Sequence, residues 1–368
     1  MVVLREYQQE AVDKTREKLK TDRCALIATC VGSGKSIIIS TLVQDYNRAV
    51  IVQPAQELVK QNHDKLSATG LDCTMIDGAH KGDWSARYVF TTPQTLSKNL
   101  DKLPEPDAVF ADEAHYGYVG KMWSGIRKKW KTCKLIGLTA TPRYYKIHTT
   151  YQGGWMWNVT TCCSLSSDIF GAPVLEITRQ QLEQLGYGRH INMQYVNIPR
   201  ISETHLADPA VYEPLIKEHL DALGALLNTL PNGLIYCDSK LHATTIVEHS
   251  NGKIELLLGT TPKKARAAMI DGFLSGNVKF IATVGCGKIG LDLPNLSSII
   301  ILTNVSNPDL LEQMIGRLNR GTCDKTCYYN SKINLKPAVV GSEDWVRIKK
   351  IGGRYETKRK KDFAWLFD

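Results

Sequence analysis

The sequence predicts an α/β protein with two doubly wound parallel-sheet domains in tandem. Three observations support this prediction. Short apolar runs of strand length alternate with longer segments of helical character, as expected for parallel strands joined by helices. The chain has 368 residues, more than a single hydrophobic core usually organises. The alternation weakens between residues 143 and 200 and then resumes, which indicates a domain on either side.

Segment boundaries and charge limit the classes of partner. We expect a first domain at residues 1–145, an insertion and linker at 146–200, a second domain at 201–330 and a basic tail at 331–368. The net charge of +9 and the pI of about 8.9 are consistent with a surface that binds polyanions. No apolar stretch approaches the ~20 residues that span a bilayer, and Arg5 and Glu6 interrupt a signal-peptide pattern. We therefore expect a cytoplasmic protein without a membrane partner.

The first strand, loop and helix form a candidate nucleotide-binding unit. Residues 24–29 are an apolar run of strand length, a glycine-rich turn follows, and residues 37–46 have helical character. In such a unit, backbone N–H groups and the helix N-terminus face phosphates, while Lys35 adds charge and Ser36 a magnesium ligand. A glycine turn that only caps a helix is the alternative. The residues expected to hold the nucleotide are Val31, Gly32, Ser33, Gly34, Lys35 and Ser36.

An acidic pair follows another buried strand. Residues 108–111 are apolar, and Asp112 and Glu113 come directly after them. Because α/β sheets bind ligands at the carboxyl ends of their strands, one carboxylate can hold Mg²⁺ through water and the other can deprotonate an attacking water. A solvated acidic turn is the alternative, but the position after a buried strand and downstream of Lys35 argues against it.

Two arginines of the second domain are candidates for stabilising charge on a γ-phosphate. Arg317 and Arg320 lie three residues apart on a helix expected to start near Pro308, so they share a face with Gln313 one turn earlier. Gly316 interrupts this helix at a cost of about 1 kcal/mol, which indicates close packing there. A solvated basic face is the alternative.

Taken in order, these segments resemble the motifs of superfamily 2 helicases of the DEAH type, in particular UvsW-like and XPB-like DNA helicases, a group with phage members. The strings that carry the resemblance are Leu4-Arg5-Glu6-Tyr7-Gln8, Gly32-Ser33-Gly34-Lys35-Ser36, Asp112-Glu113-Ala114-His115, Thr139-Ala140-Thr141-Pro142, Gly290-Leu291-Asp292-Leu293-Pro294 and Gln313-Met314-Ile315-Gly316-Arg317-Leu318-Asn319-Arg320. The resemblance covers residues 4–325. It implies two RecA-like domains with ATP and Mg²⁺ in the cleft between them. Thr29 departs from the usual first glycine of the phosphate loop.

The resemblance also assigns roles to single residues. Asp112 is expected to hold the metal, Glu113 to act as catalytic base, and Gln313, Arg317 and Arg320 to complete the site from the second domain. Residues near the nucleotide are Arg5 and Gln8, whose amide can pair with the edge of adenine, together with Gly290 and Asp292. Residues expected to couple hydrolysis to domain closure are His115, Thr139 and Thr141. Residues expected to contact the nucleic-acid backbone are Pro54, Ala55, Thr92, Pro93, Gln94, Ser239, Lys240 and Thr283.

The function expected from this set is ATP-dependent translocation along DNA, 3′ to 5′ by resemblance, with unwinding or remodelling of duplex or branched DNA. We expect a monomer. RNA is a less favoured partner, because the L-R-x-Y-Q opening resembles that of DNA translocases. Three alternatives stay open: an RNA helicase, a double-strand translocase that does not separate strands, and a nucleic-acid-binding clamp with a decayed ATPase.

The ten cysteines allow a metal interpretation that we do not favour. Cys323 and Cys327 could combine with Cys162 and Cys163 in a four-thiolate zinc site. The spacing within these pairs differs from the usual two-residue gap, so reduced and mostly buried thiols are the expected state.

Overall fold

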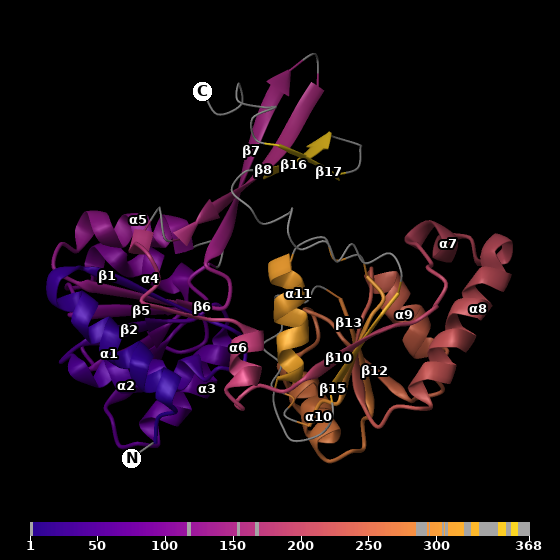
Figure 1. The fold of residues 1–368 in the computed structure, drawn as a ribbon, viewed down its shortest axis with the longest axis horizontal. Coiled ribbons are helices and arrows are strands. Elements are labelled where there is room, and N and C mark those ends of the chain that lie inside the picture. Colours follow the sequence, from indigo (N-terminus) through magenta and orange to yellow (C-terminus); the bar gives the residue numbers. More distant parts are fainter. Residues whose placement is uncertain are drawn as a thin grey trace. The chain divides into compact units, whose positions relative to one another are not determined.

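The computed structural model describes residues 3–115, 119–152, 155–165, 169–284, 293, 295–303, 305, 308–319, 325–330, 345–350 and 355–359. The chain divides into two compact units, Met1–Thr178 with Ala338–Asp368 and Arg179–Pro337. Each unit has a parallel sheet with helices on both faces (Figure 1). The expected fold class is therefore confirmed. The boundary between the units lies within the segment expected to be a linker.

The first unit is built on a seven-stranded parallel sheet with strand order β3-β4-β2-β5-β6-β1-β9. Its strands are β1 (Cys24–Thr29), β2 (Ala49–Val52), β3 (Cys73–Ile76), β4 (Tyr88–Thr91), β5 (Ala108–Asp112), β6 (Lys134–Thr139) and β9 (Leu175–Ile177). Its helices are α1 (Glu6–Thr21), α2 (Lys35–Leu42), η1 (Val43–Asp45), α3 (Gln56–Ser67), α4 (Pro93–Asn99), η2 (Leu100–Lys102) and α5 (Val119–Lys129).

Two hydrophobic cores cover the two faces of this sheet. Alternate residues of a strand point to opposite faces, so Ala25 and Ile27 lie in one core and Leu26 in the other. Helices α1, α2 and α3 pack on the first of these faces and α4 and α5 on the second. In the second core, the Trp123 and Phe170 rings meet edge to face with centroids 4.9 Å apart. The sheet is thus buried on both faces, so polar functional side chains can lie only at the ends of its strands.

The second unit has a six-stranded parallel sheet with strand order β10-β15-β14-β11-β13-β12. Its strands are β10 (Ile191–Tyr195), β11 (Gly233–Tyr236), β12 (Ile254–Leu257), β13 (Phe280–Thr283), β14 (Ser298–Ile301) and β15 (Lys325–Tyr329). Its helices are α6 (Arg179–Gln184), α7 (Glu203–Ala207), α8 (Pro209–Leu227), α9 (Lys240–Glu248), α10 (Lys263–Leu274), α11 (Pro308–Ile315) and η4 (Gly316–Leu318). Helices α8 and α9 contribute to the core on one face, and α10 and α11 to the core on the other.

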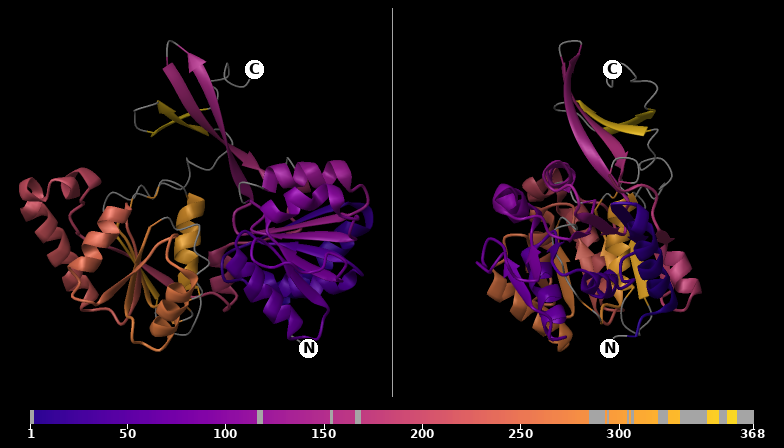
Figure 2. Two further views of the ribbon diagram at one scale, coloured as in Figure 1. Left: turned by 180° about the vertical axis from the view of Figure 1, so that it is seen from behind. Right: turned by 90° about the vertical axis from the view of Figure 1, so that its left-hand side faces the viewer.

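A separate antiparallel sheet belongs to the first unit. The hairpin β7 (Arg143–Gln152) and β8 (Trp155–Ser164) pairs with β16 (Trp345–Lys350), which in turn pairs with β17 (Tyr355–Arg359) (Figure 2). The expected insertion thus includes a long hairpin, and the expected basic tail contains two strands. Local sequence could not show this, because β16, the second partner of β8, lies far from it in the sequence.

Helix α11 ends earlier than the sequence analysis predicted. The α-helix stops at Ile315, and Gly316, Arg317 and Leu318 form one 3₁₀ turn. Such tighter turns are common at helix C-termini, and a glycine favours them because it weakens the α-helical state. The expectation that Arg317 continues the α-helical face of Gln313 is therefore wrong.

Candidate active site

The phosphate loop connects β1 to α2 and depends on two glycines. Gly32 and Gly34 have φ of 85° and 83°, a left-handed conformation that residues with a Cβ rarely adopt. Position 34 also lacks space, because a Cβ there would lie 2.5 Å from the Gln8 side-chain nitrogen. Lys35 opens α2, and its side chain is buried. The sequence therefore folds here into the cradle expected of a nucleotide-binding loop.

Helix α1 is bonded to the phosphate loop through two buried side chains. The Ser33 carbonyl accepts hydrogen bonds from the Tyr7 hydroxyl at 2.5 Å and from Gln8 Nε2 at 2.9 Å. Gln8 Oε1 accepts from the Arg5 backbone N–H at 3.0 Å, and burial raises the pKa of Tyr7. In this structure the Gln8 amide thus contacts the loop and the start of α1. Its pairing with adenine stays a prediction, whereas the contact of Tyr7 with the loop was not foreseen.

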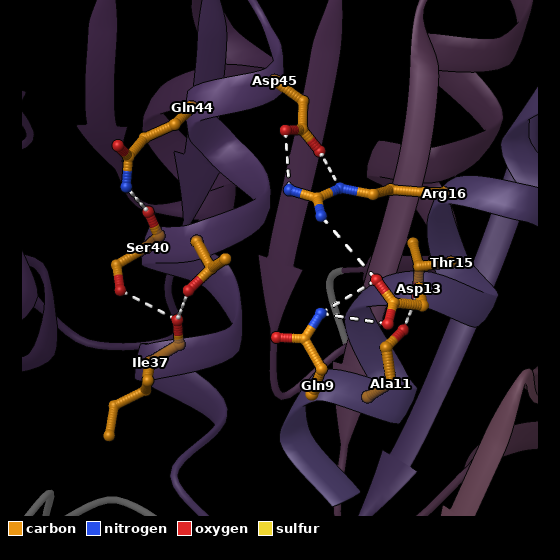
Figure 3. A network of polar contacts seen from close by, with 10 residues as sticks. Gln9, Ala11, Asp13, Thr15, Arg16, Ile37, Ser40, Gln44 and Asp45 are labelled. Atoms are coloured by element: carbon orange, nitrogen blue, oxygen red, sulfur yellow. Dashed lines mark hydrogen bonds and ion pairs between the residues drawn. The ribbon is translucent and has the colours of Figure 1, made fainter. Parts of the chain in front are cut away.

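A second connection joins α1 to η1, the short helix that follows α2 (Figure 3). The Arg16 guanidinium donates to both carboxylate oxygens of Asp45, at 2.8 and 2.9 Å. Asp13 is 3.8 Å from the same guanidinium and accepts two hydrogen bonds from the Gln9 amide. Surface ion pairs contribute little to stability, but the fork geometry fixes the angle of a side chain well. Helix α1 is therefore bonded to the phosphate loop near its start and to η1 further along its length.

The acidic pair lies at the carboxyl end of β5, as predicted. Asp112 is the last residue of the strand, and Glu113 follows with φ of 51°, in the left-handed region. The Glu113 backbone N–H donates to Asp112 Oδ1 at 3.0 Å, and Glu113 Oε1 lies 3.4 Å from Lys35 Nζ. Strained backbone of this kind concentrates at functional sites. The turn places the three charged side chains of the candidate catalytic group together.

Burial and mutual charge determine the ionisation of this group. Burial, reinforced by the neighbouring Glu113 charge, raises the pKa of Asp112 to about 6. Burial by itself would also raise the pKa of Glu113, but Lys35 and His115 outweigh it and lower that pKa. Burial opposes the charge on Lys35, yet attraction from Glu113 and Asp112 raises its pKa overall. Glu113 and Lys35 are therefore both charged at neutral pH and form an ion pair.

A chain of polar contacts leads from Glu113 to the end of β6, and its hydrogen bonds begin at His115. His115 Nδ1 lies 3.5 Å from Glu113 Oε2 and 2.7 Å from the Thr139 hydroxyl oxygen. That hydroxyl donates to the Thr141 carbonyl and accepts from the Thr141 backbone N–H, both at 3.0 Å. Because the hydroxyl proton goes to Thr141, His115 Nδ1 carries a proton and donates to Thr139. All three residues predicted to couple hydrolysis to movement are thus brought together.

Several predicted nucleic-acid contacts lie where helices begin. Ala55 is the residue before α3, Thr92 caps α4 by accepting from the Thr95 N–H, and Ser239 caps α9 by accepting from the His242 N–H. Pro54 and Ala55 are half-buried, Thr92 and Pro93 are buried, and Gln94 and Lys240 are exposed. Helix N-termini favour phosphate oxygens. Thr283 differs, because it is fully buried at the end of β13.

The remaining predicted residues belong to the second unit. Gln313 in α11 and Arg317 in η4 are half-buried. Asn319 next to them accepts a hydrogen bond from the Arg189 backbone N–H at 2.9 Å. Gly290, Asp292 and Arg320 lie outside the described residues, as does Cys323 of the zinc alternative.

Two sequence comparisons define the class of protein. Residues 1–144 match the family described as "Type III restriction enzyme, res subunit", and residues 218–322 match the "Helicase conserved C-terminal domain". The two matches fall on the two α/β units. Together they indicate a superfamily 2 helicase.

Individual relatives are more distant. The ATP-dependent RNA helicase dbp3 of Sclerotinia sclerotiorum is 23% identical over 297 residues, which cover 74% of this chain and 45% of dbp3. The chain therefore spans less than half the length of this relative. Dbp5 of S. cerevisiae, solved with RNA and ADP BeF3, has a TM-score of 0.63 at 16% identity over 88% of this chain and 83% of that one. LlaBIII, an ATP-dependent Type ISP restriction-modification enzyme solved with DNA, has a TM-score of 0.65 at 16% identity over 90% of this chain and 28% of that one.

Two other features are absent from the described part of the chain. No helix there is long and apolar enough to cross a membrane. The described His, Cys, Asp and Glu side chains include no cluster of three or more that could hold a metal ion by themselves. A magnesium ion at the phosphate loop does not need such a cluster, since it usually takes one or two protein ligands together with phosphate oxygens.

Proposed function

We propose that this protein is an ATP-dependent DNA translocase that unwinds or remodels duplex or branched DNA. The observation that carries the ATPase part is the Lys35–Glu113 ion pair of 3.4 Å, formed between the phosphate loop and the acidic turn. The residues present fit ATP and Mg²⁺: the loop needs glycine at position 34, and the buried Ser33 hydroxyl oxygen has no hydrogen-bond partner among the described residues. Both features suit a bound phosphate chain.

The charges suggest how the site changes when it is filled. Lys35 and the loop N–H groups would hold the β- and γ-phosphates, while Ser36 and Asp112 would hold Mg²⁺. The metal, when bound, neutralises phosphate charge and orients the γ-phosphate for attack. Phosphate charge attracts Lys35 away from Glu113, and the freed carboxylate can then accept a proton from the attacking water. The ion pair thus keeps the base inactive until a nucleotide is present.

Coupling to movement is proposed to run through His115 and Thr139. His115 Nδ1 lies between the Glu113 carboxylate and the Thr139 hydroxyl. When the Glu113 carboxylate loses its charge or moves, the contacts of His115 Nδ1 therefore change. Thr139 in turn holds the turn at Thr141, at the point where the chain enters the β7–β8 hairpin. In the second unit, we propose that Gln313, Arg317 and Arg320 complete the site, with Gly290 and Asp292 near the nucleotide.

DNA is the proposed track for two reasons. The first unit matches the family of a restriction-enzyme subunit, and the DNA-bound LlaBIII shares the fold over 90% of this chain. The L-R-x-Y-Q opening also resembles UvsW-like and XPB-like enzymes. An RNA helicase is the second candidate, because dbp3 is named an RNA helicase and Dbp5 was solved with RNA. Phosphate contacts from helix N-termini, as expected at Ala55 and Ser239, serve either polymer.

The test is the ATP turnover of the full chain with single-stranded DNA, duplex DNA, forks, four-way junctions and single-stranded RNA. We expect DNA to raise ATP turnover. We also expect the protein to unwind a forked DNA that carries a 3′ single-stranded tail. Stimulation by RNA alone would replace DNA with RNA as the track. Nucleic-acid binding without any turnover, unchanged in Lys35→Ala, would instead support the clamp with a decayed ATPase.

A further inference from the structure

A pocket of about 380 Å³ lies in the first unit between α2, α3 and the sheet. Its volume is within the range of small-molecule sites. The wall residues come from α2 (Ser36, Ile37, Ile39, Ser40), β2 and its end (Ile51, Gln53), α3 (Asn62, Lys65, Leu66), Thr69 and β4 (Phe90). Of these, Ile39, Ile51, Leu66 and Phe90 are buried apolar side chains, whereas Lys65 and Thr69 are exposed. The pocket thus has a mainly apolar interior, with the buried amides of Gln53 and Asn62 in its wall, and a polar rim.

Gln53 is the unusual residue of this wall. Its side chain is 1% exposed, and neither Nε2 nor Oε1 has a hydrogen-bond partner among the described residues. Buried amides are nearly always hydrogen-bonded, because an unpaired donor or acceptor keeps the cost of leaving water. The terminal torsion of glutamine is broad, so a small rotation can turn both atoms toward the pocket. The amide would then offer an adjacent hydrogen-bond donor and acceptor to a ligand with a matching acceptor and donor.

Polar side chains of α2 and of η1 after it do not compete for this amide. The Ser40 hydroxyl donates to the Ile37 carbonyl at 2.8 Å, and the Gln44 side chain donates to the Ser40 carbonyl at 2.7 Å (Figure 3). Both side chains bond to backbone carbonyls of α2. The Gln53 backbone N–H donates to the Thr91 carbonyl, whereas neither polar atom of the side-chain amide has a partner among the described residues.

We propose that this pocket binds a small planar molecule with a lactam edge, such as a free pyrimidine base. The C=O and N–H of a lactam match the N–H₂ and C=O of Gln53, and the ring fits among Ile51, Leu66 and Phe90. The site is separate from the proposed ATP site, although Ser36 and Ile37 in the first turn of α2 contribute to both neighbourhoods. Binding here does not require ATP hydrolysis.

The test is ligand-observed NMR on the full chain with uracil, using 1,3-dimethyluracil as the matched probe that lacks N–H donors. We expect saturable binding of uracil. The affinity for 1,3-dimethyluracil should be at least about tenfold weaker, because a lost hydrogen bond in a buried site costs about a factor of ten in affinity. Equal affinities would overturn the lactam assignment, and no saturation of either probe would overturn the site.

Variants locate the binding. Gln53→Leu removes the amide with little change in volume, and Ser40→Leu adds volume on the α2 wall; both are expected to weaken uracil binding by about tenfold or more. Gln44→Leu makes the same chemical change as Gln53→Leu at an exposed position outside the pocket and is expected to bind as the parent does. Melting curves confirm folding, and Gln53→Leu should melt at the same or a higher temperature. Parent-like binding by Gln53→Leu would overturn the proposal.

Two further experiments distinguish binding at this pocket from binding at the nucleotide site. Lys35→Ala is expected to keep uracil binding, so loss of the ATPase and loss of the pocket are distinguishable. Uracil is also expected to remain bound when ADP and Mg²⁺ are added. Displacement of uracil in direct competition with ADP would place it in the nucleotide site and would overturn the inference.

Discussion

The Nε2 atoms of His219 and His242 lie 3.1 Å apart in the interior of the second unit. Their tautomers follow from their other contacts. His219 Nδ1 lies 2.6 Å from the Pro199 carbonyl and must carry a proton, whereas His242 Nδ1 accepts from the Asp238 backbone N–H at 3.3 Å. His242 Nε2–H therefore donates to His219 Nε2. Both rings are neutral and all four nitrogens are hydrogen-bonded.

This pair predicts that the second unit loses stability in acid. Burial, with a contribution from His219, lowers the pKa of His242 to about 4, and burial lowers that of His219. Asp238 and Arg200 are the charged groups facing the pair, with opposite effects on the pKa of His242. An unfolded histidine has a pKa of about 6.5, so between these values the unfolded chain binds more protons. The free energy of unfolding therefore falls as the pH decreases from about 6.5 toward 4.

His242→Gln tests this prediction, because glutamine can accept from Asp238 and donate to His219 without titrating. The free energy of unfolding, measured with urea, decreases in the parent between about pH 7.5 and 5. In the variant this decrease should be smaller by about 1 to 3 kcal/mol. His249→Gln, at an exposed histidine after α9, is the control and should keep the parental slope. An unchanged pH dependence in His242→Gln would contradict the assignment.

Two glycines with the same backbone angle separate strain from crowding. Gly34 has φ of 83° and a Cβ there would meet Gln8 Nε2 at 2.5 Å, whereas Gly70 has φ of 82° and nothing within 4 Å. Gly70→Ala should cost only the strain of about 1 to 2 kcal/mol. Gly34→Ala should cost more and should also abolish binding of a fluorescent ATP analogue. Equal unfolding free energies for the two variants would show that crowding against Gln8 is absent.

Glu113→Gln should separate binding from chemistry. The amide cannot accept a proton from water, so kcat should fall by about 10²- to 10⁴-fold. Nucleotide affinity should be kept, because Lys35 no longer has to leave an ion pair. Lys35→Ala is the comparison and should lose both affinity and turnover. Single-turnover hydrolysis and equilibrium binding measure the two quantities. Turnover by Glu113→Gln within about tenfold of the parent would remove Glu113 from the role of base.

Thr139→Val should uncouple hydrolysis from nucleic acid. Valine keeps the volume of the fully buried side chain but leaves the His115 and Thr141 N–H groups without their acceptor. We expect a loss of stability of about 1 to 3 kcal/mol and a smaller stimulation of ATP turnover by DNA, with basal turnover retained. Thr139→Ser keeps the hydroxyl and should behave as the parent does. Full stimulation in Thr139→Val would exclude the hydroxyl from coupling.

Much of the fold could be predicted because it depends on local patterns. The apolar run before Lys35 was predicted at residues 24–29 and is β1, and the run before Asp112 was predicted at 108–111 and is β5 with one more residue. Strand and helix periodicities repeat within a few residues, so such runs are readable without a structure. The order of the motifs likewise indicated a superfamily 2 helicase before any contact was known.

Other features depend on contacts between distant segments. Four such features could not be predicted from local sequence patterns. They are the Ser33 carbonyl bonded to Tyr7 and Gln8, the buried amide of Gln53, the facing rings of His219 and His242, and the pairing of β16 with β8. The strained φ of Glu113 belongs with them, because surrounding structure has to hold a residue with a Cβ in that conformation.

The sequence by itself determined the two α/β units and the residue types that can carry ATP chemistry, since strand length, helix period and loop composition are local properties. Only the tertiary structure decided which groups meet, which charges are buried together, and which amide is left without a partner. The reason is physical: hydrogen bonds and desolvation depend on distances between side chains that chain folding alone sets.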